Sequence, residues 1–242
     1  MPSIFWISLL TFATTGAFAV AVLRRYVNQR QWHLLAWGIG LLSYSIGTLA
    51  QAILSVQFDG FLFKLWYWSG AMVVAPWLGQ GTVFLLARRG KAAWISFWAI
   101  LALSAVGLLV VFGSPLNPSA YRPGVDLSGQ FQQIFATAGA ARALRSALAI
   151  LLNTAGTVML VGGALYSVFL LQRRQAPAHR IVGVALIAVG GLLPALGGTL
   201  ILLGNPDLKY WGQLLGGLLL FAGFLVSTRE RPALAPGIRG PA

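Results

Sequence analysis

Seven long apolar stretches constrain the fold of this chain more than any other feature of its sequence. A helix needs about 20 apolar residues to cross a hydrocarbon core about 30 Å thick. Each stretch meets or approaches that length, and none contains Asp, Glu, Lys or Arg. They are Ile4–Leu23, His33–Leu54, Leu65–Leu86, Ala92–Phe112, Ala147–Leu171, Ile181–Leu203 and Tyr210–Ser227. They predict an all-α fold, a polytopic transmembrane bundle of about seven helices.

The composition supports one continuous membrane domain over residues 1–228. Only 9% of the 242 residues are charged, whereas an average soluble domain is about 25% charged. We therefore expect a multi-pass protein of the cell membrane (plasma or inner membrane), surrounded by membrane lipids. The segment 229–242 is rich in Pro, Gly and Arg, a composition typical of a disordered tail.

The distribution of basic residues predicts the orientation of the helices. Basic residues gather on the cytoplasmic side of membrane proteins. The larger of the two groups comprises Arg24, Arg25, Arg30, Arg88, Arg89, Lys91, Arg173, Arg174, Arg180, Arg229, Arg231 and Arg239. The other comprises Lys64, Arg122, Arg142, Arg145 and Lys209. Twelve against five predicts that the N-terminus lies outside and the C-terminus inside.

The first stretch has a second interpretation, because Ala17-Phe18-Ala19 is similar to the cleavage site of a signal peptide. A signal peptide begins with a positively charged region, and residues 1–4 carry no basic side chain. The apolar run also continues past Ala19 to Leu23 before Arg24 and Arg25 follow. We expect a retained transmembrane helix.

The longest predicted connection is an outer loop over residues 113–146. Its first half contains Pro115, Pro118 and Pro123, whereas Phe131, Ile134, Phe135 and Ala138 follow a helical spacing in the second half. That half is either an interfacial amphipathic helix or an outward extension of the fifth transmembrane helix. Loops of this length usually have a role, so the segment is a candidate lid or docking surface.

Two parts of the chain share a sequence of short motifs. His33 and His179 each precede a glycine-rich run, which leads to residues 47–49 and 198–200, both Gly-Thr-Leu. Residues 62–66 and 207–211 then each contain Leu, Lys and Trp. If this similarity is a repeat, the helices form a three-plus-one-plus-three pseudo-repeat, with the fourth helix as a linker.

Several kinds of chemistry lack their residues here. The chain has no cysteine, which excludes thiolate metal sites and cysteine nucleophiles. No lysine lies within the last helix to hold a retinal, and no nucleophile elbow or His-Glu-x-x-His motif occurs. His33 and His179 lie at the membrane boundary, where a histidine needs no ligand role. We expect no metal, cofactor, nucleic acid partner or catalytic residues, and do not expect an enzyme.

Polar side chains within the predicted helices are the candidate ligand-binding residues. Tyr44, Thr48 and Gln51 share one face of the second helix by their spacing, and Asn153 and Thr157 do so on the fifth. Thr199 of the sixth helix lies at a similar depth. The alternative is that these groups only form hydrogen bonds between helices, which is ordinary membrane packing.

Glycines at regular spacing indicate helix-packing faces, through which the protein could bind a partner or a second copy. Gly183, Gly190 and Gly197 recur every seven residues, and Gly212 and Gly216 form a Gly-x-x-x-Gly motif.

Residues 67–71 (Tyr-Trp-Ser-Gly-Ala), 76–82 (Pro-Trp-Leu-Gly-Gln-Gly-Thr) and 191–200 carry a resemblance to a group of bacterial seven-helix membrane proteins. The resemblance spans nearly the whole chain and implies the seven-helix fold, with no activity attached. The layout also resembles the sensory modules of some histidine kinases and the PQ-loop sugar transporters, although the chain has no Pro-Gln pair.

Two functions fit these observations. The first is a non-enzymatic seven-helix module that acts through partners, as a sensor or an accessory subunit of a membrane complex. It accounts for the packing glycines, the absence of charge within the helices and the long loop. The second is a transporter or binder of a small neutral or amphiphilic solute, which would use the candidate residues above.

Overall fold

The structure is a computed structural model that describes residues 2–87, 90–202 and 207–228. The long helices are α1 (Pro2–Gln29), α2 (Trp32–Leu54), α4 (Val74–Leu86), α5 (Lys91–Gly113), α7 (Gly139–Thr157), α9 (Ala178–Leu202) and α10 (Asp207–Ser227). Shorter ones are α3 (Gly60–Trp68), α6 (Leu127–Ile134), α8 (Gly163–Arg173) and the turn η2 (Pro118–Ala120). No strand occurs in the described ranges, so the predicted all-α class is confirmed.

Six continuous helical spans among the described residues are long and apolar enough to cross a membrane. Helices α3 and α4 form one span, Gly60–Leu86, and α7 and α8 form another, Gly139–Arg173. The other four correspond to α1, α2, α5 and α10. Helix α9 has 25 residues. Its apolar part with described side chains, Ala178–Pro194, is shorter than the six spans.

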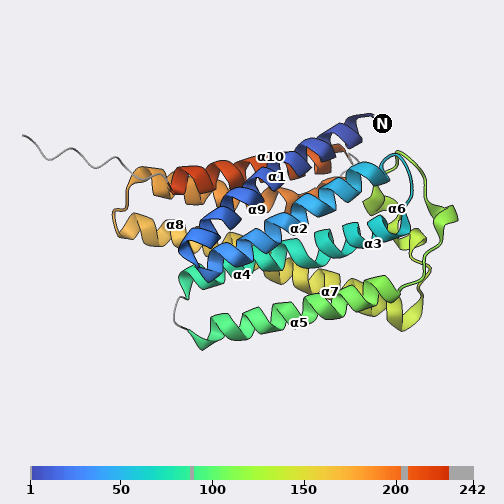
Figure 1. Cartoon of the computed structure of the whole chain (residues 1–242), viewed down its shortest axis with the longest axis horizontal. Coiled ribbons are helices and arrows are strands. Elements are labelled where there is room, and N and C mark those ends of the chain that lie inside the picture. Colours follow the sequence, from blue (N-terminus) through green and yellow to red (C-terminus); the bar gives the residue numbers. More distant parts are fainter. Residues whose placement is uncertain (1, 88–89, 203–206, 229–242) are drawn as a thin grey trace, which may run out of the picture.

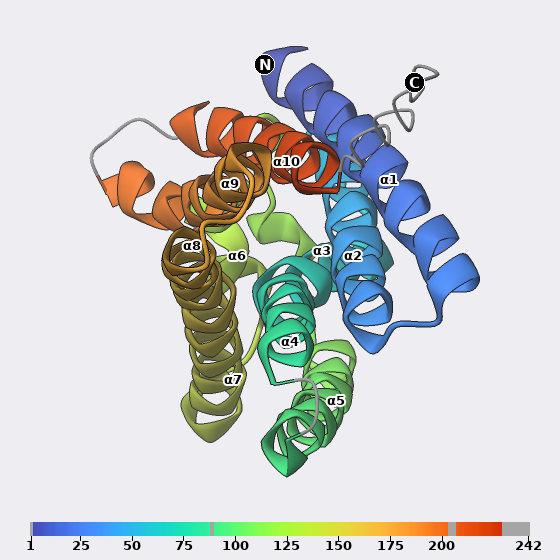
Figure 2. The ribbon, with the colours of Figure 1, turned by 90° about the vertical axis from the view of Figure 1, so that its left-hand side faces the viewer.

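The spans lie roughly parallel and form one elongated bundle (Figure 1). Helix α2 packs between α1 and α4, α4 packs against α7, and α10 packs against α9 and α1. Helix α5 lies at the periphery, as the view along the bundle shows (Figure 2). Most of its large side chains face outward, and Leu109 is 73% exposed.

Two wide, π-helical turns interrupt the composite spans: η1 (Ser69–Val73) and η3 (Val158–Gly162). Pro76 explains the first, because a proline has no N–H and its ring clashes with the carbonyl four residues earlier. That carbonyl belongs to Met72, within the turn that has widened.

The helices approach most closely at glycines. A Cβ on Gly156 of α7 would lie 2.2 Å from the Pro76 nitrogen of α4, and one on Gly79 would lie 2.6 Å from the Gly156 carbonyl oxygen. The predicted packing role of Gly183, Gly190 and Gly216 is also visible, because they lie where α9 contacts α10. These three glycines therefore serve packing within the chain.

The predicted loop 113–146 contains more helix than expected. Residues 114–138 form a strap that holds η2 and α6, and α7 already begins at Gly139. Each alternative for the second half therefore describes part of it. Helix α6 is a separate short helix, and α7 extends the fifth span outward to Gly139. Phe135 and Ala138 lie outside both helices. We call the end of the bundle that carries the strap the strap end (Figure 1).

The contact between Gly156 and Pro76 predicts that Gly156→Ala destabilises the protein. Overpacking typically costs about 1–3 kcal/mol, more than the ~1 kcal/mol that alanine gains over glycine in a helix. Thermal unfolding in detergent measures the change. Gly162→Ala in the same span is the control, because its added Cβ would meet no atom within 4 Å beyond its own stretch of helix. Equal melting temperatures for the two variants would contradict the close approach.

Candidate binding cavity

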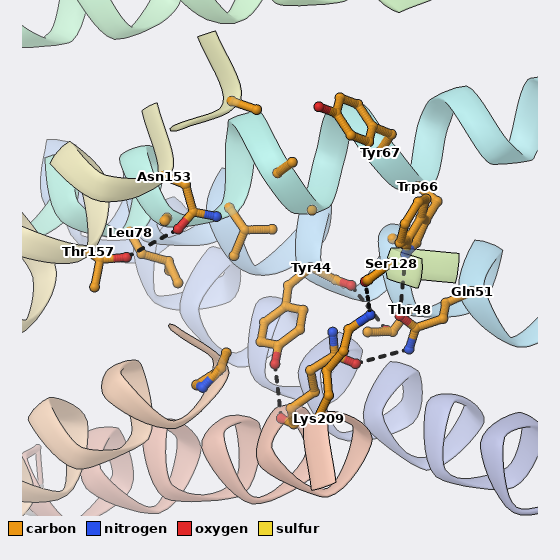
Figure 3. A pocket seen from close by; sticks show the side chains of 18 of the residues that line it. Tyr44, Thr48, Gln51, Trp66, Tyr67, Leu78, Ser128, Asn153, Thr157 and Lys209 are labelled. Atoms are coloured by element: carbon orange, nitrogen blue, oxygen red, sulfur yellow. Dashed lines mark hydrogen bonds between the residues drawn. The ribbon is translucent and has the colours of Figure 1, made fainter. Parts of the chain in front are cut away.

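A cavity of about 610 Å³ lies among the long apolar spans (Figure 3). Residues of α2, the α3–η1–α4 span, α6, α7, α9 and α10 form its walls. In α4 the last lining residue is Leu78, and the contact of Gly79 with Gly156 follows directly. The α4 wall of the cavity therefore ends at this crossing, while Thr157 and Leu160 continue the wall past Gly156.

The structure brings five of the six candidate residues to this cavity. Tyr44, Thr48 and Gln51 line it from α2, and Asn153 and Thr157 line it from α7 (Figure 3). The sixth, Thr199, has its side chain outside the described residues. The same holds for residues 198–200 of the suggested repeat. That the five residues bind a ligand remains a prediction.

Gln51 connects four helices at the strap end of the cavity. Its amide nitrogen donates to Ser8 Oγ of α1 and to Gln213 Oε1 of α10, each at 2.9 Å. Its amide oxygen accepts from the indole N–H of Trp66 in α3, at 3.3 Å. The side chain is only 1% exposed, and these bonds use both of its donors. Gln51 therefore holds the wall together rather than offering a free donor.

Tyr44 and Thr48 also use their hydroxyl donors within the protein. Tyr44 donates to the Gln213 carbonyl oxygen at 2.9 Å. Thr48 donates to carbonyl oxygens of its own helix, those of Tyr44 and Ser45. Tyr44 thus bonds between helices, as the packing alternative expects, whereas Thr48 bonds within its own helix.

The α7 side is different. Asn153 and Thr157 are half-buried. Their side chains bond to each other, with Thr157 Oγ1 donating to Asn153 Oδ1 at 3.4 Å. The neighbouring Thr154 and Ile150 line the cavity and are exposed. This wall therefore has polar groups available to an occupant, and its rim lies within the apolar span Gly139–Arg173.

A buried ion pair joins the strap to α10 at the strap end. Lys209 Nζ lies 3.0 Å from Asp126 Oδ1 and also donates to Ser128 Oγ. The Tyr210 hydroxyl donates to the same Asp126 oxygen at 2.6 Å. Both charged residues are buried, so each partner needs the other.

Arg145 of α7 is a second buried cation in this region, and it is fully enclosed. Its guanidinium carbon lies 3.8 Å from the centre of the Phe135 ring, and the group donates to Thr137 Oγ1 and Gln132 Oε1. Its Nε has no partner. Among the described residues, the ion pairs include no carboxylate for Arg145.

Hydrogen bonds and aromatic contacts hold the strap over the cavity. Tyr121 donates to the Leu54 carbonyl oxygen at 2.6 Å, and burial raises the pKa of its hydroxyl, which keeps that donor protonated. Gln130 donates to the carbonyl oxygens of Arg122 and Val125. Phe131, which lines the cavity, packs on Tyr67 with ring centres 5.4 Å apart.

The sequence analysis missed the lining residues of α6 and α10. Lys209 and Gln213 are four residues apart on α10, and Ser128 and Gln132 are four apart on α6. Both spacings place the pair on one helix face, so this signal was present. Lys209 and Arg145 were instead counted as loop cations, and the structure buries both.

The cavity combines apolar walls with amide, hydroxyl and indole groups, the usual composition of a site for a small organic molecule. In the described part of the chain, no three His, Asp or Glu side chains lie close enough together to hold a metal ion.

The Gln51 junction predicts that Gln51→Leu lowers the free energy of unfolding by about 1–2 kcal/mol, since hydrogen bonds between membrane helices average about 0.6 kcal/mol each. Thr48→Val is the control, because its hydroxyl bonds only to its own helix and its loss should cost less. Unfolding in detergent measures both. A larger loss for Thr48→Val would contradict the role assigned to Gln51.

We compared the chain with known proteins in three ways. No family model matches it, and neither a curated protein nor a solved structure matches it. Its function is therefore argued from its own residues.

Proposed function

We propose that this chain is a multi-pass membrane protein that binds a small neutral or amphiphilic molecule in the cavity. One observation carries the proposal: the folded chain forms a cavity of about 610 Å³, open at one rim, on which polar residues of four spans converge. Small-molecule sites typically measure about 300–1,000 Å³ and combine apolar walls with a few polar groups.

The distribution of the lining residues favours an amphiphile. Amide, hydroxyl and ammonium groups gather at the strap end, from Gln51, Ser128 and Lys209. The remainder of the wall is largely apolar and includes Val74, Leu78, Leu160, Pro194 and Leu220. A molecule with a polar head and an apolar body matches this division. The exposed rim at Ile150 and Thr154 would admit such a molecule from the lipid.

A module that acts through partners, as a sensor or an accessory subunit, is the second candidate. Its support is the strap, because Ser128, Phe131 and Gln132 line the cavity while Gln133 of the same short helix is exposed. An occupant would touch a segment that also forms part of the surface. Membrane lipids and a protein partner, or a second copy of the chain, would be its neighbours.

The proposal includes seven membrane crossings, with the N-terminus outside and the C-terminus in the cytoplasm of the cell whose membrane holds the protein. Helix α9 would be the crossing added to the six spans that length and apolarity already support. The orientation is supported by the basic residues, because the inner side would carry twelve of them and the outer side five. The N-terminus lies at the strap end (Figure 1), so the strap would be outside.

This orientation predicts which positions a membrane-impermeant maleimide reaches on intact cells. The chain has no cysteine of its own, so Ser119→Cys in the strap and Gln172→Cys at the end of α8 can each be labelled alone. Both positions are exposed. We expect labelling of Ser119→Cys before lysis and of Gln172→Cys only after it. The opposite result would reverse the proposed orientation.

The available polar wall of α7 predicts the effect of the double variant Asn153→Leu, Thr157→Val on the binding of 1,12-dodecanediol, which has a second hydroxyl for this wall when the first lies at the strap end. Losing one or two neutral hydrogen bonds should weaken binding about two- to tenfold while the melting temperature stays near that of the parent. Native mass spectrometry from a maltoside detergent measures the bound fraction. Asn28→Leu, an exposed position away from the cavity, is the control. Unchanged binding by the double variant would remove α7 from the site.

A further inference from the structure

We infer that the occupant carries a carboxylate and places it at the strap end of the cavity. The ligand class is then a single-chain anionic amphiphile, such as a long-chain fatty acid. This inference deepens the proposed function and depends on it. Its basis is the direction of the hydrogen bonds around the polar end, which leaves donors facing the cavity.

The first chain of bonds begins at Trp66. An indole N–H can only donate, so the Gln51 group facing it at 3.3 Å must be the amide oxygen. The Gln51 nitrogen then donates to Gln213 Oε1 at 2.9 Å. The Gln213 side-chain oxygen therefore accepts from Gln51, and the NH₂ group of Gln213 is the part of its amide that makes no hydrogen bond within the described part of the chain.

Arg145 fixes a second amide in the same manner. A guanidinium can only donate, and Arg145 Nη2 faces Gln132 Oε1 at 3.5 Å. The NH₂ group of Gln132 is therefore its free end. The buried side-chain atoms without a partner in the described ranges are Asp126 Oδ2 and Arg145 Nε. Neither of these two amide nitrogens is among them, so both keep surface open to a small molecule.

Lys209 sets the third direction. Its ammonium has three donors, of which Asp126 Oδ1 and Ser128 Oγ accept two. The Ser128 hydroxyl, having accepted from Lys209, can donate its own proton. Lys209, Ser128, Gln132 and Gln213 all line the cavity. Their unused groups are all donors, so the complementary head group is one that accepts hydrogen bonds.

The local charge makes that acceptor an anion. Asp126 offsets Lys209 through their 3.0 Å contact, and its unpaired Oδ2 is not part of the cavity wall. Arg145 adds a positive charge that no carboxylate in the described part of the chain pairs with. It lies directly behind Gln132 and Tyr67, and both of these line the cavity. A buried cation is costly unless it is paired, and a carboxylate in the cavity would supply the missing charge.

The test offers dodecanoate, dodecanol and dodecylamine separately to the full-length protein in a maltoside detergent and follows binding by native mass spectrometry. We expect dodecanoate to bind about tenfold or more tightly than dodecanol, because charge-assisted hydrogen bonds are roughly twice as strong as neutral ones. We expect dodecylamine to bind least. Equal binding of dodecanoate and dodecanol would overturn the carboxylate inference and leave the proposed function standing. If none of the three binds, the proposed function fails and the inference fails with it.

The decisive variant is Gln132→Glu. It keeps an oxygen for Arg145 to donate to, replaces the free NH₂ group by a second carboxylate oxygen, and supplies the missing negative charge from the protein itself. Dodecanoate should then bind at least about tenfold more weakly and lose its preference over dodecanol, and the melting temperature should not fall, because Arg145 gains a charged partner. Gln133→Glu, an exposed neighbour outside the cavity wall, carries the same charge change as the control. Equal dodecanoate affinity of Gln132→Glu and the parent protein would overturn the inference.

Discussion

The bonding of Gln51 is the interaction on which the strap end of the molecule depends. Water is absent from a bilayer core, so a buried amide must find its partners within the protein. Gln51 finds them on α1, α3 and α10, and none of these helices can shift by much without breaking one of these bonds. The same bonds decide which way the neighbouring amide of Gln213 faces. Helix placement and the chemical character of the cavity therefore have a common origin.

The cavity also depends on the crossing of α4 and α7, where the backbones meet at Pro76, Gly79 and Gly156. The wide turns η1 and η3 lie on either side of that meeting along their spans, and both contribute lining residues. Wide turns of this kind recur at functional sites because they shift the faces of the helix on either side. Helices α4 and α7 touch at this crossing and separate next to it, and the separation leaves room for the cavity.

Much of the fold could be predicted from the sequence, because the bilayer requires each span to be apolar over its whole length. The predicted third and fifth spans began at Leu65 and Ala147, and the structure extends them back to Gly60 and Gly139. Arg142 and Arg145 made residues before Ala147 look like a loop. Phe135 and Thr137 of the strap help to cover Arg145, a contact that no local pattern reveals.

The candidate site was predictable in part, through the helical spacing of Tyr44, Thr48 and Gln51 and of Asn153 and Thr157. Spacing identifies the face but not whether its hydrogen-bonding groups are already used. Thr48 bonds to its own helix, whereas Asn153 keeps its amide nitrogen available. That difference comes from the positions of neighbouring helices. Predicting that α10 lines the cavity would require treating Lys209 as a buried residue. Its position next to a loop in the sequence favours an exposed residue instead.

The peripheral position of α5 has a consequence for how the sequence can change over evolutionary time. Its polar ties to the bundle are few: Trp68 donates to the Ser104 carbonyl, Trp77 to the Ser104 hydroxyl, Lys64 to the Phe112 carbonyl, and Gln80 bonds to Ala93 and Ser96. Its inner face, which includes Ile100 and Val111, is buried. The larger part of its surface faces outward, and lipid distinguishes little between one apolar side chain and another. Selection can therefore act on this outward surface mainly through its length and apolarity, so it can drift in sequence while the cavity walls stay fixed.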